Sequence, residues 1–331
     1  MKKLALTLLG LVAIAALAFL LLRVPDTDPA EMRAKYGGEP SRFVEMPDGN
    51  IFHVRDEGPR GGLPIVLLHG SNADLHTWEP WARALSGDYR VIRFDQIGHG
   101  LTGASVDGEY APDAFAADVE MIADALGLER FVLAGNSMGG GVAMTYALKH
   151  PERLAGLVLV DASGAPVERE SGGNLAFTLA RIPGVGAVLS QFLPRSLVER
   201  SLSQSVSNQD VVTPGAVDRY WEMARYPGTR AATRARFASR REPFAAADVA
   251  ALQLPVLVMW GKEDALIPYD AAGWFMRHLP NASLAAYDDI GHLPMEEGPD
   301  RTASDLRAWL ASSISSPQPP ADPTPTVDSA N

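Results

Sequence analysis

Short apolar runs alternate with longer amphipathic stretches along most of this chain. The runs are bounded by Gly, Pro, Asn or Asp, so they predict eight β-strands. Because apolar strands alternate with helices, we expect an α/β fold whose mostly parallel sheet carries helices on both faces. The first two strands, joined by the tight turn "MPDGN", are expected to pair antiparallel. The predicted strands are Arg42–Glu45, Asn50–Arg55, Pro64–Leu68, Tyr89–Phe94, Phe131–Ala134, Gly156–Val160, Pro255–Trp260 and Ser283–Tyr287. The clearest predicted helices are Tyr110–Leu126, Met138–His150 and Asp300–Ser312.

Two segments interrupt this alternation. Residues 165–251 hold helix-like pieces and no convincing strand, and they directly follow the carboxyl end of a predicted strand. That position favours a helical cap over a site at the edge of the sheet. The last residues, 313–331, are rich in Pro and poor in large apolar groups, so we expect a disordered tail. The α/β core is then predicted to comprise residues 41–164 and 252–312.

The N-terminal segment is the most apolar part of the chain. Its opening "MKK" precedes nineteen uncharged, mostly apolar residues, Leu4–Leu22. A helix of that length reaches about 28 Å, close to the roughly 30 Å hydrocarbon core of a bilayer. The alternative is a cleaved signal segment, but the small-x-small site at Ala16–Ala18 lies inside the apolar run. We expect residues 1–24 to anchor the protein in a membrane and residues 25–40 to form a linker. The two lysines favour a globular part on the periplasmic or another extracytoplasmic side.

Composition excludes several classes of partner and chemistry. The 331 residues are enough for one large α/β domain with an insertion. Forty acidic and 29 basic residues give a formal charge of −11, and no basic run could follow a phosphate backbone. We therefore expect no nucleic-acid partner. The chain has no cysteine, which excludes disulfides, thiolate catalysis and cysteine-ligated metal sites.

The stretch "RFVLAGNSMGGG" carries the strongest chemical signal. Its segment "GNSMG" fits G-x-S-x-G, in which a strand turns sharply into a helix and points the serine hydroxyl outward. Ser137 is therefore the candidate nucleophile. The same pattern also occurs in ordinary glycine-rich turns, so its weight depends on finding an acid, a base and an oxyanion loop elsewhere in the chain.

The candidate base and acid follow the last two predicted strands. His292, in "DDIGHLPMEE", is the one histidine beyond the last strand. Asp264 follows the penultimate strand "PVLVMWG", where a buried carboxylate would fix the tautomer of the base. Asp161, in "VLVDAS", is the alternative acid, although a turn or helix-capping role explains it as well. The chain order serine, acid, histidine favours Asp264.

An oxyanion hole requires two backbone amides directed at the developing negative charge. Met138, the residue after the candidate nucleophile, is expected to supply one. The loop "LLHGSNADLHTW" after the third strand is expected to supply the other, from Ser71 or, as the alternative, from Asn72.

Five motifs, "LLHGSNADLHTW", "FDQIGHGLT", "GNSMGG", "GKEDALIP" and "GHLPMEE", resemble in order and spacing those of the α/β-hydrolase superfamily, over roughly Phe43–Leu310. The resemblance implies the α/β-hydrolase fold, with an eight-stranded, mostly parallel sheet and a helical cap at residues 165–251. It also implies a catalytic triad of Ser137, Asp264 and His292 that uses no metal and no organic cofactor. An anchor followed by such a domain resembles membrane-tethered bacterial members of the superfamily.

The serine at the sharp strand-to-helix turn, the nucleophile elbow of the superfamily, limits the chemistry that the resemblance implies. Dehalogenases and epoxide hydrolases of the superfamily use aspartate there, so Ser137 argues against both. We expect hydrolysis of a carboxylic ester, or of a related lactone or thioester, through an acyl-enzyme. The expected partner is a small-molecule substrate with an apolar group seated under the cap.

Two alternatives remain. One is a carbon–carbon bond hydrolase of the meta-cleavage type, because "GNSMGG", including Asn136, resembles the elbow of that subfamily. Those enzymes typically carry a tryptophan after the histidine, where this chain has Leu293. Their anionic substrate also calls for a cationic side chain near the serine. The candidate cations in the predicted cap are Arg181, Arg219, Arg225, Arg234 and Arg236.

The second alternative is a catalytically silent, membrane-tethered binding protein on the same scaffold.

Overall fold

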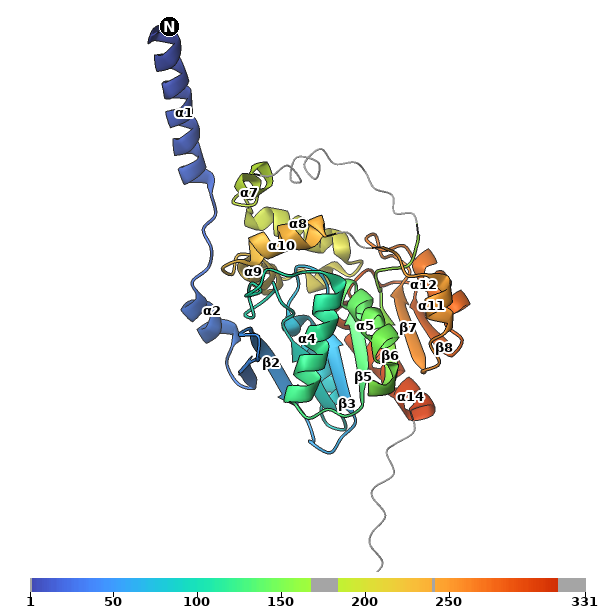
Figure 1. The fold of residues 1–331 in the computed structure, drawn as a ribbon. Coiled ribbons are helices and arrows are strands. Elements are labelled where there is room, and N and C mark those ends of the chain that lie inside the picture. Colours follow the sequence, from blue (N-terminus) through green and yellow to red (C-terminus); the bar gives the residue numbers. More distant parts are fainter. Residues whose placement is uncertain (1, 168–183, 240–241, 315–331) are drawn as a thin grey trace, which may run out of the picture.

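The computed structural model describes residues 2–167, 184–239 and 242–314 (Figure 1), so the predicted tail lies outside the described residues from position 315 on. An eight-stranded sheet in the order β1-β2-β4-β3-β5-β6-β7-β8 forms the centre. β2 pairs antiparallel with both β1 and β4, and the other neighbours are parallel. The eight predicted strands are confirmed, with ends that agree within two residues. The strands are β1 (Ser41–Glu45), β2 (Ile51–Glu57), β3 (Pro64–Leu68), β4 (Arg90–Phe94), β5 (Phe131–Asn136), β6 (Leu154–Val160), β7 (Val256–Gly261) and β8 (Ala282–Tyr287).

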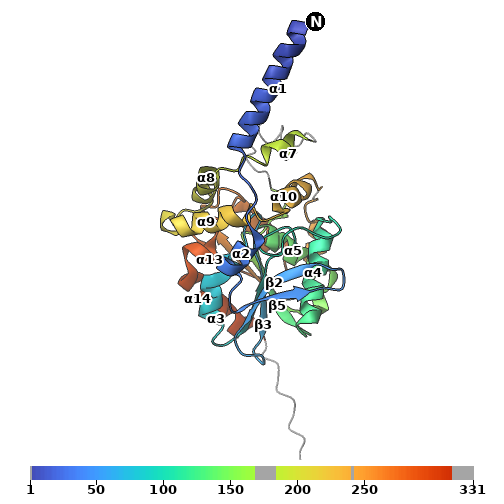
Figure 2. The same cartoon turned by 90° about the vertical axis from the view of Figure 1, so that its left-hand side faces the viewer.

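Helices cover both faces of the sheet. These are α3 (Glu79–Leu85), α4 (Pro112–Ala125), α5 (Met138–Lys149), α11 (Ala246–Ala250), α12 (Asp270–His278) and α14 (Pro299–Ser313), with short 3₁₀ helices at Leu75–Trp78 and Pro151–Arg153. Successive strand residues point to opposite faces. In β3, Val66 and Leu68 therefore join the apolar core that includes α4, α5, α11 and α12, while Ile65 and Leu67 join the core that includes α3 and α14. Figure 2 shows the sheet between α4 on one side and α3 with α14 on the other.

Between β6 and β7 the chain forms a helical insertion, residues 165–251, whose described part consists of helices and loops. Besides α11, it contains α7 (Val185–Leu189), α8 (Arg195–Ser205), a 3₁₀ helix (Gln209–Val211), α9 (Pro214–Met223) and α10 (Thr229–Ala238). α8, α9 and α10 lie together over one end of the sheet (Figures 1 and 2). α10 approaches the core closely because two glycines lack a Cβ. A Cβ on Gly98 would lie 2.8 Å from the Ala232 methyl, and one on Gly228 would lie 2.6 Å from that of Ala104.

Helix α1 (Lys2–Leu22) extends away from the rest of the molecule (Figure 1). In the part of the chain that the structure describes, no helix combines the length and apolarity needed to cross a membrane. The expected transmembrane anchor is thus not supported. The segment expected to be a linker, residues 25–40, contains helix α2 (Pro29–Tyr36). Asp28 caps this helix by accepting hydrogen bonds from two amides of its first turn.

Residues 24–36, which we call the N-terminal strap, are bound to the helical insertion. Arg230 Nη2 donates to the carbonyl of Val24 at 2.7 Å, and Arg225 Nη1 donates to that of Pro25 at 3.1 Å. Two side chains of α2 also bond to Glu222 Oε2, each at 2.7 Å. The strap therefore contributes to the position of the insertion above the sheet.

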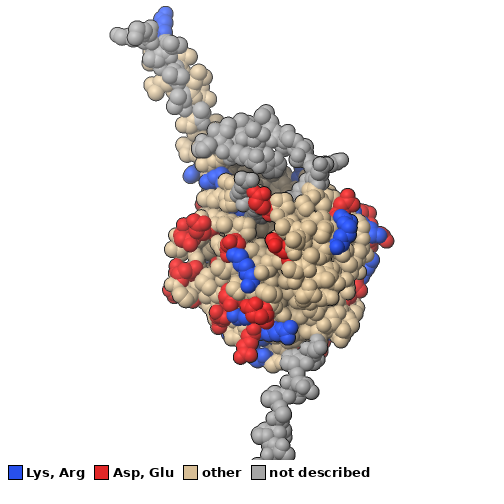
Figure 3. All heavy atoms as spheres, turned by 45° about the vertical axis from the view of Figure 1, so that its right-hand side comes forward, with Lys and Arg blue, Asp and Glu red and all other residues tan. Residues whose placement is uncertain are grey.

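Charged side chains of both signs are mixed on the face that Figure 3 presents. Lys and Arg side chains lie beside Asp and Glu side chains there, and much of the face between them carries neither. Surface ion pairs of this kind include Arg301 with Asp289 at 2.9 Å. Such exposed pairs add little to stability.

Candidate active site

Ser137 lies at the sharp turn from β5 into α5. Its backbone has φ 55° and ψ −117°, a conformation that residues with a side chain rarely adopt. The flanking glycines make this turn possible. A Cβ on Gly135 would collide with the Gly139 carbonyl, and a Cβ on Gly139 would collide with the Leu68 carbonyl of β3. The turn is further fixed by the Ser137 amide, which donates to Val160 O at 3.0 Å.

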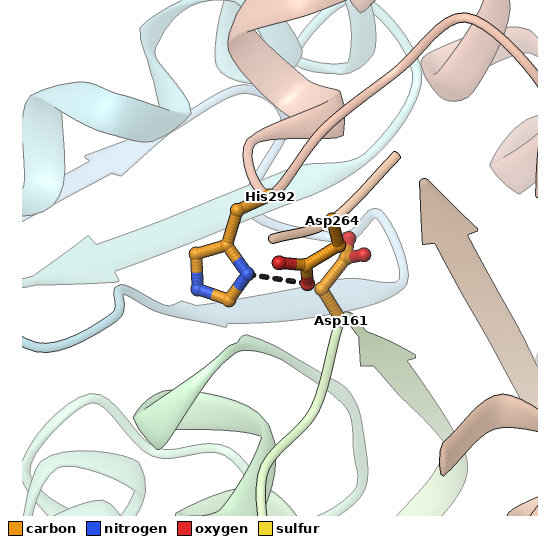
Figure 4. A group of neighbouring side chains, drawn as sticks. All are labelled: Asp161, Asp264 and His292. Carbon is orange, nitrogen blue, oxygen red and sulfur yellow. Dashed lines mark hydrogen bonds and ion pairs between the residues drawn. The ribbon is translucent and has the colours of Figure 1, made fainter. Parts of the chain in front are cut away.

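His292 and Asp264 meet beside this turn. The loop after β8 supplies His292, whose Nδ1 lies 2.6 Å from Asp264 Oδ2 (Figure 4). The other oxygen of Asp264 accepts hydrogen bonds from the amides of Leu266 at 2.7 Å and Ile267 at 3.0 Å. These amides hold the carboxylate toward the imidazole. With Nδ1–H donating to the carboxylate, Nε2 is the ring nitrogen that can take a proton.

We call the turn at Ser137 the elbow, and the loop after β8 that carries His292 the histidine loop. Asn136 joins these two segments. Its Nδ2 donates to the carbonyl of His292 at 3.0 Å. Within the described residues, no hydrogen bond joins the Ser137 hydroxyl to the His292 ring. Catalytic hydrogen bonds are commonly long in unliganded enzymes and shorten when substrate binds. The structure thus brings the predicted nucleophile, base and acid to one region, and their catalytic roles stay a prediction.

Asp161, the alternative acid, is buried next to Asp264 (Figure 4). One of its oxygens accepts a hydrogen bond from the Gly261 amide at 3.0 Å. Burial and the charge of Asp264 raise the pKa of Asp161 well above its usual value. Of these two described carboxyl groups, the His292 imidazole is hydrogen-bonded to Asp264. Among the described residues, these three side chains are also the one acidic and histidine group whose ligand atoms could share a metal ion.

The loop after β3, residues 69–72, lies against the elbow, and we call it the β3 loop. A Cβ on Gly70 would lie 2.9 Å from Asn136 Oδ1 and 3.1 Å from Ser137 Cβ, so a side chain at this position would have to displace these two residues. Ser71 is half-buried, and Asn72 has a left-handed backbone with φ 58°. The Met138 amide belongs to the first turn of α5, where amides have no acceptor within the helix. The two predicted oxyanion donors thus belong to segments that flank Ser137.

Arg236 of α10 joins the insertion to both of these segments. Its Nη2 donates to Asn72 Oδ1 at 3.0 Å, and its Nη1 contacts Met138 Sδ at 3.2 Å and bonds to His99 Nε2. The side chain is 1% exposed. Burial and the neighbouring guanidinium hold the pKa of His99 well below its usual value, so this imidazole is neutral and accepts the bond. His99 Nδ1 then donates to the Ile97 carbonyl at 3.0 Å.

The other candidate cations of the insertion are engaged elsewhere. Arg219 pairs with Glu296 at 3.3 Å, Arg225 stacks on the ring of Trp221, and Arg234 donates to Ser190 Oγ at 2.7 Å. Arg181 lies outside the described residues. Of the described candidates, Arg236 is thus the one that contacts residues flanking Ser137.

Sequence reasoning missed Glu297, which organises the histidine loop. This buried carboxylate at the end of α13 (Pro294–Glu297) accepts hydrogen bonds from the amides of Gly291 at 3.1 Å and Leu293 at 3.2 Å, on either side of His292. It also accepts one from the Ser207 amide of the insertion at 2.7 Å. The signal for it was the acidic residue in the first turn of a short Pro-initiated helix, where a carboxylate can cap free amides.

Comparison with known proteins gives the family context of this site. The sequence profile described as the alpha/beta hydrolase fold matches residues 64–299. The chain is 31% identical over 278 residues to a non-heme chloroperoxidase of Streptomyces lividans, a match that covers 81% of this chain and 99% of that protein. It is 28% identical over 268 residues to a 2-hydroxymuconate semialdehyde hydrolase of Pseudomonas sp. (strain CF600), covering 78% of this chain and 90% of that protein.

A solved structure resembles nearly the whole chain. The crystal structure of a membrane phospholipase A, described as a novel bacterial virulence factor, superposes with a TM-score of 0.73 at 26% identity. The match covers 96% of this chain and 100% of that one. The similar proteins therefore include hydrolases named for different substrates.

Proposed function

The chain belongs to the α/β-hydrolase fold family and is a hydrolase, and we propose that it cleaves carboxylic esters, or related lactones or thioesters, with Ser137 as nucleophile. The observation that carries the proposal is the 2.6 Å hydrogen bond between His292 Nδ1 and Asp264 Oδ2 beside a serine held at a strained turn. These groups supply a base, an acid that orients it and the hydroxyl of a half-buried serine, which are the parts that acyl transfer needs.

Each group has a defined part in the proposed reaction. Ser137 Oγ attacks the ester carbonyl carbon while its proton moves to His292 Nε2, and Asp264 stabilises the resulting imidazolium. The oxygen of the tetrahedral intermediate accepts hydrogen bonds from the amides of Met138 and Ser71. The alcohol leaves with the proton from His292, and water then attacks the acyl-enzyme by the same route. No metal or organic cofactor enters these steps.

The proposal assigns the helical insertion the role of a cap. Support comes from α8, α9 and α10, which lie over one end of the sheet, and from the contact of α10 with the β3 loop through Asn72. The substrate is then a small molecule with an apolar group under the cap. The likeness to a membrane phospholipase A also supports a lipid-like ester and association with a membrane through α1. The two lysines that precede the apolar run favour a site outside the cytoplasm.

One observation favours a second candidate, carbon–carbon bond hydrolysis of the meta-cleavage type. Buried Arg236 lies beside Met138 and Asn72, where a cation could meet an anionic dienoate, and one relative is a 2-hydroxymuconate semialdehyde hydrolase. Both terminal nitrogens of Arg236 are bonded to protein groups, however, and Leu293 follows the histidine. Ester hydrolysis therefore remains the leading candidate, and a silent binding protein does not fit a family of enzymes.

The test compares both substrate classes on one enzyme preparation. Aryl esters of increasing acyl length and a 2-hydroxy-6-oxo-dienoate are assayed with Ser137→Ala as the blank. We expect kcat/KM for the best ester to exceed that for the dienoate by at least about 10²-fold, a gap of about 2.7 kcal/mol in transition-state stabilisation. Faster consumption of the dienoate would overturn ester hydrolysis in favour of carbon–carbon cleavage. Labelling of Ser137 by a fluorophosphonate, abolished in Ser137→Ala, tests the nucleophile itself.

A further inference from the structure

A second carboxyl group lies behind the Asp264–His292 pair. Asp161 directly follows β6, has a left-handed backbone conformation with φ 45° and is fully buried. Its Oδ1 accepts a hydrogen bond from the Gly261 amide, but its Oδ2 has no donor among the described residues. Ligand atoms of Asp161, Asp264 and His292 all lie within 4.8 Å of one another (Figure 4). A buried oxygen without a donor beside another carboxylate requires an explanation.

The two carboxyl groups differ in how many donors they meet. Asp264 accepts hydrogen bonds from His292 Nδ1 and from two backbone amides, all of which favour its ionised form. Asp161 accepts one, from a backbone amide. Two buried carboxylates this close cannot both ionise without a large electrostatic cost. If the pair holds one proton, the proton therefore belongs on Asp161.

The other charged and titratable groups around Asp161 agree with this assignment. Burial raises the pKa of Asp161 most, followed by the charge of Asp264, and Glu297 of α13 adds a smaller effect in the same direction. Tyr287 of β8 also interacts with Asp161, and burial raises the pKa of that phenol, so it stays neutral. The hydrogen bond from the Gly261 amide lowers the pKa of Asp161 and so opposes these effects. The His292 ring is bonded through Nδ1 to Asp264.

We propose that Asp161 is a positioning residue that carries a proton and donates it in a hydrogen bond to Asp264, so that the pair presents a single negative charge to His292. The proton supplies the missing donor at the carboxyl pair and gives the Asp264 carboxylate one more hydrogen bond, in addition to those from His292 and the two amides. The role of Asp161 in turnover rests on the proposed function, whereas its protonation does not.

Two variants of Asp161 separate this role from general packing. Asp161→Asn keeps the shape, accepts from the Gly261 amide and still offers an N–H to Asp264, so we expect kcat for an ester within about threefold of wild type. Asp161→Leu offers no donor, and we expect kcat to fall at least roughly tenfold with little change in KM, since a hydrogen bond to a charged group is lost. An Asn variant as impaired as the Leu variant, or two variants that both match wild type, would overturn the proposal.

Infrared spectroscopy tests the proton without relying on activity or on the Leu variant. The difference spectrum of wild type minus Asp161→Asn at neutral pH should contain the C=O stretching band of a protonated carboxylic acid. Asp118→Asn is the matched control, because burial raises the pKa of Asp118 to about 8 and its own protonated band should disappear instead. Carboxylate bands in the Asp161 difference spectrum would overturn the proposal. A wild type that hydrolyses no ester would refute the proposed function and leave this measurement valid.

Discussion

Replacing Arg236 with methionine tests how the helical insertion supports the site. Methionine keeps an unbranched apolar stem of similar reach and removes the guanidinium, so packing of the buried stem is largely preserved. The variant loses the hydrogen bonds from Arg236 to Asn72 Oδ1 and to His99 Nε2. The perturbation therefore acts on polar contacts between α10, the β3 loop and the loop after β4.

The expected loss in stability follows from the acceptors left behind. His99 Nε2 is buried and loses its donor, which costs about 1–3 kcal/mol. Asn72 Oδ1 keeps a weaker partner, the Thr233 hydroxyl at 3.4 Å, so the loss of its hydrogen bond from Arg236 adds less to the cost in stability. We expect the free energy of unfolding to fall by roughly 1–3 kcal/mol.

The expected loss in catalysis follows from the neighbour of Asn72. Asn72 holds a left-handed backbone next to Ser71, whose amide is the second proposed oxyanion donor. Complete removal of one such donor costs about 10²- to 10³-fold in kcat, so a displaced Ser71 amide should cost roughly 10-fold or more. Because the oxyanion forms only in the transition state, kcat should fall while KM changes little.

Arg234→Met on the same helix is the control for this experiment. Arg234 donates to Ser190 Oγ and to a carbonyl within α10, and none of these contacts reaches the β3 loop. Steady-state kinetics with an aryl ester and unfolding in urea should be measured for both variants. Equal effects of the two substitutions, or a rise in KM with unchanged kcat for Arg236→Met, would refute the reasoning. Loss of dienoate cleavage alone would indicate that the guanidinium contacts substrate.

Three further predictions concern the site, the N-terminal strap and a buried acid. Ser137→Ala and His292→Ala should each lower ester turnover by several orders of magnitude, and the double variant should be little worse, because the groups act as a unit; additive losses would contradict this. Deletion of residues 1–36 should lower the thermal unfolding temperature more than deletion of residues 1–22, because only the longer deletion removes the strap's bonds to the insertion. Equal unfolding temperatures for the two deletions would contradict a stabilising role of the strap. Burial raises the pKa of Asp118 from 3.8 to about 8, so the folded state binds a proton that the unfolded chain releases within that window. This group should therefore lower the free energy of unfolding as pH rises from about 4 to 8. In urea titrations at a series of pH values, Asp118→Asn should make the measured fall smaller and leave the part that Asp161 contributes.

The strands and the elbow could be predicted because their signals are local. Buried strands such as β7 are continuous apolar runs, and the turn at Ser137 requires glycine wherever a Cβ would strike the chain. The same logic would have found α2, because Asp28 followed by Pro29 is a helix-start signal. Its low apolar content hid that helix, since only Met32 within it is buried.

The supporting residues could not be predicted because their partners are remote in sequence. Arg236 bonds to Asn72 across 164 positions, and Glu297 bonds to Ser207 across 90. From the sequence alone, a buried arginine on an amphipathic helix cannot be distinguished from a solvent-exposed one. Only the fold reveals which of the candidate cations is buried beside the elbow.

Buried charge explains why these remote pairs exist at all. A charged group taken out of water must meet a partner or lose its charge, so each buried ionisable side chain constrains a specific element to lie against it. Arg236 ties the insertion to the β3 loop, and Glu297 ties it to the histidine loop. The position of the insertion and the geometry around Ser137 are therefore coupled through the same bonds. Asp161 loses its charge instead of pairing with an opposite one, because beside Asp264 it can remain buried only by keeping its proton.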